Sequence, residues 1–276
     1  MPDHQTKTLS VAGATVHYET WGHGPLLVII PGGPQDAGVF AELAAHLSDR
    51  YTVLAFDPRG NSRTISDTPP GDLDIDVIAD DVAALIATNS NGPAHVFGTS
   101  GGAQIGLNLA ARHPHSVSVL IAHEPPSTML LADPEPALAR DRALYQTYRR
   151  DGIEAAMGQF FAENGLDGPP DFEMPPEAAE TFARVGRNFE YWLAHGMLPL
   201  ATYRPDVEAL RRGTPRIVVA VGVGSAGQAI ETMNLALAEH LGAKPTAFPG
   251  DHMGFETDPA GFADAVDRAI REGYHG

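Results

Sequence analysis

The stretch Gly98-Thr99-Ser100-Gly101-Gly102 stands between an apolar run at 94–97 and a segment of helical character at 103–111. A Gly-x-Ser-x-Gly sequence at a sharp strand-to-helix turn is typical of a nucleophile elbow, in which the serine hydroxyl projects from a strained turn. The glycines let neighbouring backbone approach closely. Ser100 is therefore the candidate nucleophile. Because short Gly and Ser clusters also form ordinary turns, this interpretation depends on the rest of the chain.

Apolar runs and helical patterns alternate on both sides of the pentad. Runs typical of buried strands lie at 14–21, 26–30, 52–56, 94–97, 117–122, 217–221 and 246–248. Helical spacing is found at 37–47, 75–86, 103–111, 229–241 and 259–272. Apolar strands that alternate with helices predict an α/β fold, with a mainly parallel sheet covered on both faces.

The alternation breaks between about residues 127 and 212. This stretch contains no convincing buried strand, but it has helical patterns at 137–149 and 178–193, separated by Pro and Gly at 168–170 and 175–176. A segment of ~85 residues is far longer than the dozen that a crossover connection needs. We therefore expect a core of residues 1–127 and 213–276 and a helical cap of residues 128–212.

Composition excludes several classes of function. The chain has 18 Lys and Arg against 35 Asp and Glu, and the formal net charge of -17 opposes binding to nucleic acid or to anionic membranes. The absence of cysteine excludes disulfides, thiolate catalysis and cysteine-based zinc sites. Because no histidine cluster has the spacing of metal ligands, we expect neither a metal nor a cofactor.

The sequence also shows no membrane or targeting signal. No apolar run approaches the ~20 residues of a membrane span. Residues 1–7 lack a cationic segment followed by an apolar one. We expect a cytoplasmic protein that does not bind membranes, and the sequence does not indicate its oligomeric state.

Four motifs occur in an order that resembles the α/β-hydrolase superfamily. Pro31-Gly32-Gly33-Pro34 follows the run at 26–30, and Asp57-Pro58-Arg59-Gly60-Asn61-Ser62 follows the run at 52–56. The serine pentad comes next, and Gly250-Asp251-His252-Met253-Gly254 follows the last run. The superfamily's oxyanion loop, Asp-x-Arg-Gly-x-Ser segment, elbow and late histidine have the same order. The resemblance covers nearly the whole chain and implies a mostly parallel eight-stranded sheet, with a helical cap inserted after the sixth strand.

A serine hydroxyl is a weak nucleophile until a neighbouring base removes its proton, so a histidine must lie near Ser100 in the fold. His252 stands in a glycine-flanked loop after a strand, and the order of the motifs indicates that it is the base. Histidines at the ends of helical patterns or on strands are more simply interpreted as capping or structural residues. These are His17, His46, His95, His113, His123 and His240.

Acyl transfer places negative charge on a carbonyl oxygen and calls for two preorganised donors. The resemblance implies that these are the backbone N–H groups of Gly33 and Gly101. Pro34 has no N–H and cannot donate. Pro31 stands where many members of the superfamily have histidine, which leaves open what supports the loop.

A serine and a histidine of this kind act together with a carboxylate that orients the histidine, which completes a catalytic triad. The position of this carboxylate departs from the commonest pattern of the superfamily. The superfamily most often carries its acid after the seventh strand, but residues 222–228 contain no carboxylate. Asp251 is unsuitable because adjacent side chains in a loop diverge, and Glu231 is more simply a solvated residue. The superfamily's other position follows the sixth strand, where Glu124 follows the run at 117–122. We therefore predict a Ser100-Glu124-His252 triad, the alternative being that Glu124 pairs with a cation or caps a helix.

A serine at the elbow excludes relatives that use an aspartate nucleophile, such as haloalkane dehalogenases and epoxide hydrolases. We expect a small hydrophobic ester or lactone as substrate, because the His-Glu-x-Pro segment at 123–126 resembles zearalenone-type lactone hydrolases. Three alternatives are a proline iminopeptidase-like amidase, echoed by Gly32-Gly33-Pro34, a cofactor-free haloperoxidase or perhydrolase, and a non-catalytic ligand-binding relative. Candidate pocket residues in the cap are Phe160, Phe161, Phe182, Phe189, Tyr191, Trp192 and Met197.

Overall fold

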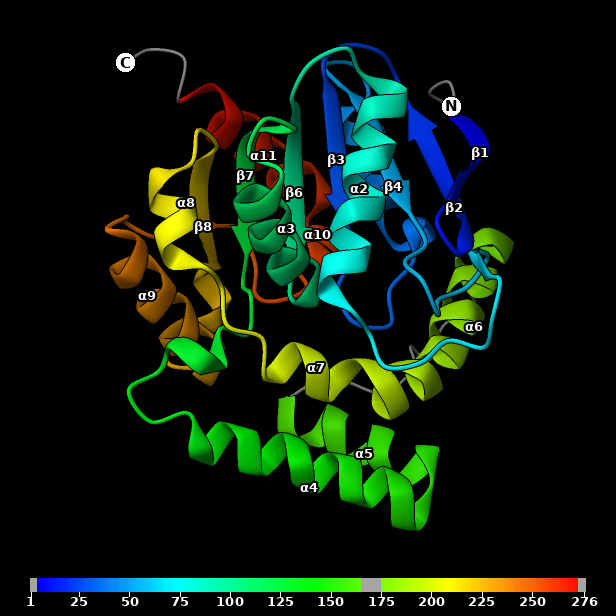
Figure 1. Cartoon of the computed structure of the whole chain (residues 1–276), viewed down its shortest axis with the longest axis vertical. Coiled ribbons are helices and arrows are strands. Elements are labelled where there is room, and N and C mark those ends of the chain that lie inside the picture. Colours follow the sequence, from blue (N-terminus) through cyan, green and yellow to red (C-terminus); the bar gives the residue numbers. More distant parts are fainter. Residues whose placement is uncertain (1–3, 165–174, 273–276) are drawn as a thin grey trace.

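A twisted, mostly parallel β-sheet runs through the middle of the molecule in a computed structural model that describes residues 4–164 and 175–272 (Figure 1). The strands are ordered β1-β2-β4-β3-β6-β7-β8-β9 across the sheet. From β4 onward, neighbouring strands are parallel, whereas β1 and β2 form an antiparallel edge. The bounds are β1 His4–Val11, β2 Ala14–Trp21, β3 Leu26–Ile30, β4 Thr52–Phe56, β6 Ala94–Thr99, β7 Val117–His123, β8 Arg216–Gly222 and β9 Thr246–Phe248.

The α/β-hydrolase fold predicted from the sequence is confirmed, with one difference in strand number. Within the described residues the sheet has nine strands instead of eight, because the two-residue strand β5 (Ile65–Ser66) also pairs with β2. The periodicity missed β1, whose residues are mostly exposed and therefore lack the alternation of a half-buried strand. With β5 inserted in the numbering, the predicted sixth strand is β7 and the predicted seventh is β8.

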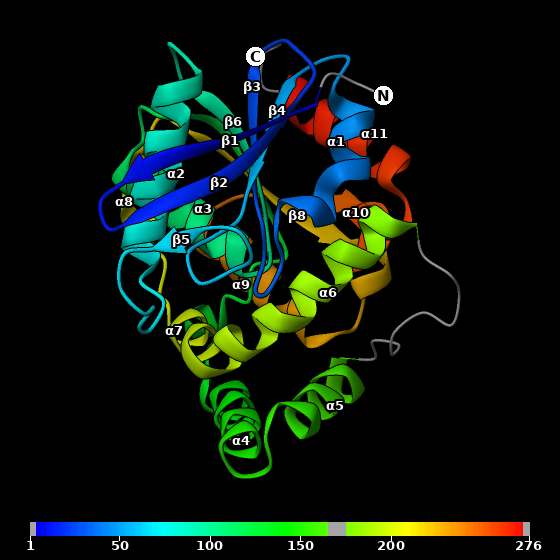
Figure 2. The same ribbon diagram turned by 90° about the vertical axis from the view of Figure 1, so that its right-hand side faces the viewer.

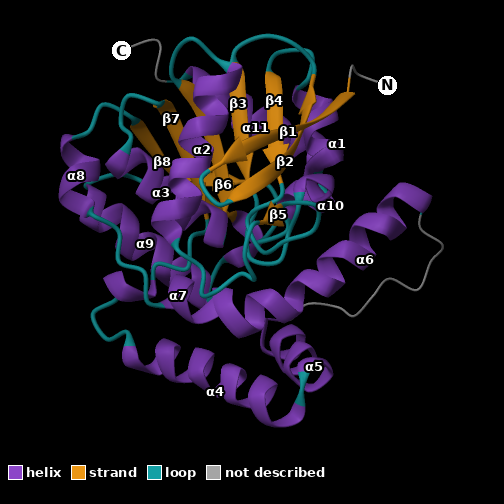
Figure 3. Ribbon diagram, turned by 45° about the vertical axis from the view of Figure 1, so that its right-hand side comes forward, coloured by secondary structure: helices purple, strands orange, loops and turns teal. Residues whose placement is uncertain are grey.

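Helices cover both faces of the sheet, as continuous apolar strands require (Figures 2 and 3). One face packs against α2 (Ile75–Asn89), α3 (Gly101–Arg112), α8 (Val207–Arg212) and α9 (Ala229–Leu241). The other packs against α1 (Ala41–Leu47), α10 (Gly254–Thr257) and α11 (Pro259–Arg271). All five residues of the central strand β3 are buried between these layers. None of the described helices is both long and apolar enough to cross a bilayer.

The segment between β7 and β8 consists of helices joined by loops, with no strand among its described residues. It contains a 3-10 turn (Thr128–Leu130), α4 (Glu135–Asp151), α5 (Ile153–Asn164), α6 (Pro176–Tyr191), a π-helical turn (Trp192–Gly196) and α7 (Met197–Ala201), followed by α8. Figure 1 shows α4 and α5 farthest from the sheet and α7 between them and the core. A small apolar cluster that includes Leu144, Ala156, Leu193 and Met197 holds these helices together. The Pro and Gly residues at 168–170 lie outside the described residues.

The loop after β4 is fixed to the antiparallel edge by buried charges. Arg63 donates from Nε to Asp57 Oδ2 at 2.8 Å and from Nη2 to Asp57 Oδ1 at 3.0 Å. It also pairs with Glu19 on β2, which lies 3.4 Å from the ring of His17. Burial raises the pKa of Glu19, but the hydrogen bond with His17 and the charge of Arg63 lower it by more, to about 2. This cluster anchors the chain on either side of residues 58–62.

The depressed pKa of Glu19 makes the stability of the fold depend on pH. The ionised carboxylate stabilises the folded state fully above its ordinary pKa, and this contribution is lost as pH falls toward the folded-state pKa. We expect the free energy of unfolding of the wild type to fall by about 2 kcal/mol more than that of Glu19→Gln between pH 5 and pH 3. Urea titrations measure this difference. Glu42→Gln, at an exposed position on α1, serves as the control, and parallel curves for the wild type and Glu19→Gln would contradict the assignment.

Candidate active site

Ser100 occupies the turn between β6 and α3, as the pentad predicts. Its φ of 53° and ψ of -126° lie in a region that non-glycine residues rarely adopt. Its N–H donates to the carbonyl of His123 at 2.9 Å, which ties the turn to the end of β7. A Cβ on Gly102 would lie 2.1 Å from the carbonyl oxygen of Ile30, so only glycine fits there. These contacts hold the serine in a strained turn.

Glu124 and His252, 128 residues apart in the chain, meet in a hydrogen bond. His252 Nδ1 lies 2.7 Å from Glu124 Oε2, and the other carboxylate oxygen accepts the N–H of Gly222 at 2.9 Å. Glu124 is fully buried, while the side chain of His252 is 33% exposed. A carboxylate on Nδ1 favours the tautomer that leaves Nε2 unprotonated, which is the form that can act as a base.

The surroundings of Glu124 keep it ionised. Burial raises the pKa of this carboxyl, but hydrogen bonding, above all with His252, lowers it below its ordinary value. Burial also lowers the pKa of His123, to about 3, so this ring is neutral. The rings of His123 and His252 stack with their centroids 6.2 Å apart. Glu124 therefore interacts as an anion with His252, which is partially exposed, whereas the buried ring of His123 stays neutral.

The packing of the loop after β8 leaves no room for a side chain at residue 222. Gly224 donates to the carbonyl of Gly250 at 2.7 Å, and a Cβ on Gly222 would lie 2.8 Å from the same oxygen. Backbone from the loop that carries His252 thus fills the space that a side chain at 222 would need. The other carboxylates weighed as the acid bind elsewhere, since Asp251 accepts the N–H of Met253 at 2.9 Å and Glu231 that of Gly227 at 2.7 Å.

The two predicted oxyanion donors lie on adjacent segments. The nitrogen of Gly33 is 3.4 Å from the point that a Cβ on Gly101 would occupy. Gly32 donates to the side chain of Gln35 at 3.0 Å, whereas no hydrogen-bond acceptor among the described residues occupies the N–H of Gly33 or Gly101. The first N–H groups of a helix are unpaired as a rule, and the N-terminus of α3 favours negative charge.

Asn61 is a site residue whose role the sequence did not reveal. Its Nδ2 donates to the carbonyls of Gly33 at 3.1 Å and Gln35 at 3.0 Å. Asn61 belongs to the Asp-x-Arg-Gly-x-Ser segment, which was the only available signal. The motif gave its position but not its partner, since the two residues are 28 apart in the chain.

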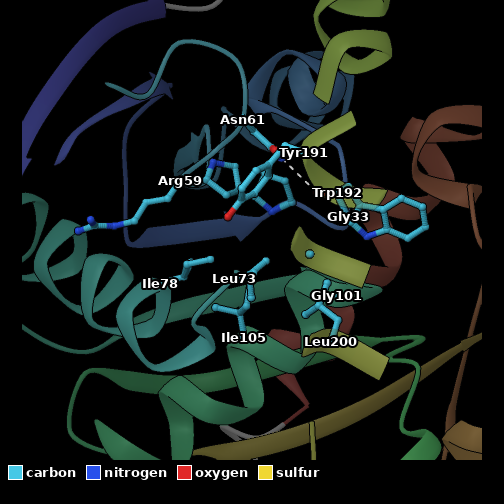
Figure 4. A pocket seen from close by; sticks show the side chains of 13 residues that line it. Gly33, Arg59, Asn61, Leu73, Ile78, Gly101, Ile105, Tyr191, Trp192 and Leu200 are labelled. Atoms are coloured by element: carbon cyan, nitrogen blue, oxygen red, sulfur yellow. Dashed lines mark hydrogen bonds between the residues drawn. The ribbon is translucent and has the colours of Figure 1, made fainter. Parts of the chain in front are cut away.

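A cavity of about 10 Å³, enough for one water molecule, lies beside the two donors (Figure 4). Trp192 and Leu200 from the cap cover it. Trp192 lies beside the position that a Cβ on Gly33 would take, and Leu200 beside that of a Cβ on Gly101. Of the cap residues expected to line a pocket, Tyr191 and Trp192 do so, whereas Phe182 is exposed. The remaining walls are mainly apolar, with Leu73, Ile78 and Ile105 among them.

Among the residues that the structure describes, no group of three or more His, Asp or Glu side chains lies close enough together to hold a metal ion.

Comparison with known proteins shows the family of this chain. Residues 25–164 match the family model described as the alpha/beta hydrolase fold. The chain belongs to the α/β-hydrolase family. The uncharacterized hydrolase YraK of Bacillus subtilis is 33% identical to this α/β-hydrolase over 255 residues, which cover 90% of this chain and 89% of that protein.

Solved structures of other α/β-hydrolases share the fold. A thermophilic esterase from Thermogutta terrifontis is similar with a TM-score of 0.74 and 21% identity, covering 97% of this chain and 98% of the other. The enol-lactonase from Burkholderia xenovorans gives a TM-score of 0.70 at 18% identity, covering 96% and 99%. At these identities the likeness concerns the fold.

Replacing the buried carboxylate tests its predicted role. Glu124→Gln can still accept the N–H of Gly222, but an amide group beside His252 Nδ1 favours the wrong tautomer of the ring. We expect kcat on a p-nitrophenyl ester to fall by roughly 10³ to 10⁴, with little change in melting temperature. Steady-state kinetics and thermal unfolding measure the two quantities.

Two further variants decide between Glu124 and the alternative acids. We expect Asp251→Asn and Glu231→Gln to retain activity within about threefold, because both carboxylates accept backbone N–H groups and neither binds the ring of His252. A large loss in either variant, with full activity in Glu124→Gln, would remove Glu124 from the mechanism.

Proposed function

We propose that this α/β-hydrolase cleaves carboxylic esters or lactones through an acyl-enzyme on Ser100. The observation that carries the proposal is the 2.7 Å hydrogen bond from His252 to the buried carboxylate of Glu124, in a protein whose serine stands at a strained elbow. A serine needs a base, the base needs an orienting carboxylate, and the oxyanion needs two donors. The chain supplies a candidate for each role.

In the proposed first half-reaction, Ser100 Oγ attacks the substrate carbonyl carbon while His252 Nε2 takes the hydroxyl proton. Glu124 stabilises the resulting imidazolium through Nδ1. The carbonyl oxygen becomes an oxyanion and accepts the N–H groups of Gly33 and Gly101. When the tetrahedral intermediate collapses, the C–O bond to the leaving group breaks, and His252 passes its proton to the departing alcohol.

The second half-reaction repeats these steps with water. His252 removes a proton from a water molecule, whose oxygen attacks the acyl carbon of the Ser100 ester. The same donors hold the oxyanion, the bond to Ser100 Oγ breaks, and the serine recovers its proton from His252. The products are a carboxylic acid and an alcohol, or a single hydroxy acid when the substrate is a lactone.

The lining of the cavity favours an ester over a peptide substrate. A peptidase that selects a free amino terminus needs a carboxylate to bind the amine, but none of the residues around the described cavity is acidic. Glu177 and Glu180 on the cap are exposed, and Glu180 pairs with Arg184 at 3.5 Å. Glu173 lies outside the described residues. The mainly apolar walls fit a hydrophobic substrate.

Covalent labelling and a substrate panel test the proposed reaction. We expect a fluorophosphonate to label the wild type on Ser100 and p-nitrophenyl acetate to be hydrolysed, while Ser100→Ala shows neither reaction because the nucleophile is gone. Prolyl p-nitroanilides should be poor substrates. Absence of labelling would favour a ligand-binding role, and faster cleavage of prolyl amides than of esters would favour an amidase.

The position of Leu200 beside an oxyanion donor predicts a preference for short acyl chains. Leu200 covers the oxyanion donor, since its Cδ1 lies 2.8 Å from the position of a Cβ on Gly101. We expect the wild type to hydrolyse p-nitrophenyl acetate at least tenfold more efficiently than the hexanoate, and Leu200→Ala to narrow this ratio. Values of kcat/KM for the two esters measure it. An unchanged ratio would show that the acyl chain lies elsewhere.

A further inference from the structure

The cap helix α6 is joined to the core loop at 33–38 by a buried ion pair. Arg184 Nε donates to Asp36 Oδ2 at 2.6 Å. Asp36 is fully buried, and its carboxylate also accepts the hydroxyl of Ser62 at 2.8 Å and the N–H of Gly38 at 2.9 Å. Buried charges are stable only when paired and hydrogen-bonded in this way, so α6 cannot leave the loop without exposing or unpairing both.

One turn further along α6, Asn188 makes a second connection to the same loop. Its Nδ2 donates to the carbonyl of Pro34 at 2.8 Å and to Ser62 Oγ at 2.8 Å, and its Oδ1 accepts the N–H of Ser62 at 2.8 Å. Asn188 is buried. Ser62 has a φ of 48°, a conformation that non-glycine residues seldom adopt, and these bonds hold it there.

Together the contacts fix four consecutive residues of the oxyanion loop. Asn61 from the core holds the carbonyls of Gly33 and Gln35, while the cap holds Pro34 through Asn188 and shares Asp36, through Arg184, with the core residue Ser62. The two sets of bonds alternate along the chain. Part of the side-chain support for this loop therefore comes from the cap.

Glycines let α6 pack against the two core loops at short range. A Cβ on Gly60 would lie 2.2 Å from the ring of Tyr191, and one on Gly38 would lie 2.5 Å from Thr181 Oγ1. The helix is thus seated directly on the loops that follow β3 and β4. Figure 3 shows α6 crossing this end of the sheet, in contrast to α4 and α5, which lie farther out.

We propose that Asn188 and Arg184 are positioning residues, through which the seated cap helix holds the Gly33 amide where it can bind the oxyanion. This inference rests on the proposed function. A donor that is misplaced by a fraction of an ångström loses much of its effect on a transition state, so a loop fixed at each residue is a physical requirement for catalysis. Pro31 has no polar side chain to give such support, and the cap provides it instead. The oxyanion hole is complete only while α6 is seated.

Kinetics separate this role from a merely structural one. In Asn188→Ala the carbonyl of Pro34 loses its donor, while Ser100, His252 and Glu124 keep their contacts. We expect kcat for p-nitrophenyl acetate to fall 10- to 100-fold with KM unchanged within threefold. A trifluoromethyl ketone, which binds serine hydrolases as an oxyanion adduct, should lose affinity by the same factor as kcat. Arg187→Ala, at an exposed position on the same helix, is the matched control and should match the wild type in all three quantities.

Variants of the ion pair provide a second measurement if Asn188→Ala folds poorly. Arg184→Lys keeps the charge but not the Nε donor, and we expect a fall in kcat and ketone affinity of the same kind. In Asn188→Gln the side-chain amide can again bind Ser62 and the carbonyl of Pro34. We expect this variant to recover part of the kcat and ketone affinity that Asn188→Ala loses. Wild-type kcat and ketone affinity in folded Asn188→Ala or Arg184→Lys would overturn the proposal, as would a loss confined to melting temperature or KM.

Labelling of Ser100 distinguishes a failure of this inference from a failure of the proposed function. If the wild type hydrolyses no ester, the proposed function is wrong. The rate of fluorophosphonate labelling then replaces kcat, because the phosphoryl oxygen needs the same two donors. Slower labelling in Asn188→Ala than in Arg187→Ala would still support the positioning role, and equal rates would refute it.

Discussion

The hydrogen bond between Glu124 and His252 constrains the backbone around it as much as it orients the ring. It joins the end of β7 to the loop after β9, with the end of β8 lying between them in the sheet. The last residue of β8, Gly222, has no side chain to clash with the loop that carries His252, and its N–H binds the carboxylate. The acid after β7 and the glycine at the end of β8 are therefore parts of the same arrangement.

Backbone strain is concentrated at this end of the sheet. In the parts of the chain that the structure describes, the non-glycine residues with positive φ are Ser62, Ser100 and Glu124. Such conformations cost of order 1–3 kcal/mol each and persist only where the surrounding structure determines them. Here the determining contacts are buried, namely the parallel strands below and the hydrogen bonds from neighbouring loops. The rigidity of the sheet makes it possible to hold reactive groups in unfavourable backbone geometry.

The cap adds a connection that its helical composition does not indicate. An ion pair such as that of Asp36 and Arg184 contributes little net stability, because the cost of desolvating both charges offsets their attraction. Its value lies in specifying one arrangement, since any shift of α6 leaves a buried charge unpaired. Among the described residues, no hydrogen bond or ion pair joins α4 or α5 to the oxyanion loop, so α6 is the cap helix that is fixed to it.

The sequence by itself determined the alternation of buried strands and helices, the elbow at Ser100 and the choice of Glu124 and His252 as partners. The strands, helices and elbow follow from apolar runs and glycine spacing, and the choice of Glu124 and His252 follows from the resemblance to the α/β-hydrolase superfamily together with the absence of a carboxylate at 222–228. Exposed β1 escaped detection because an edge strand needs no apolar alternation. Only the tertiary structure decided what supports the oxyanion loop, because Arg184 lies 148 residues from Asp36 and Asn188 lies 154 from Pro34. A polar side chain carries no sign of its distant partner, and packing alone brings the two together.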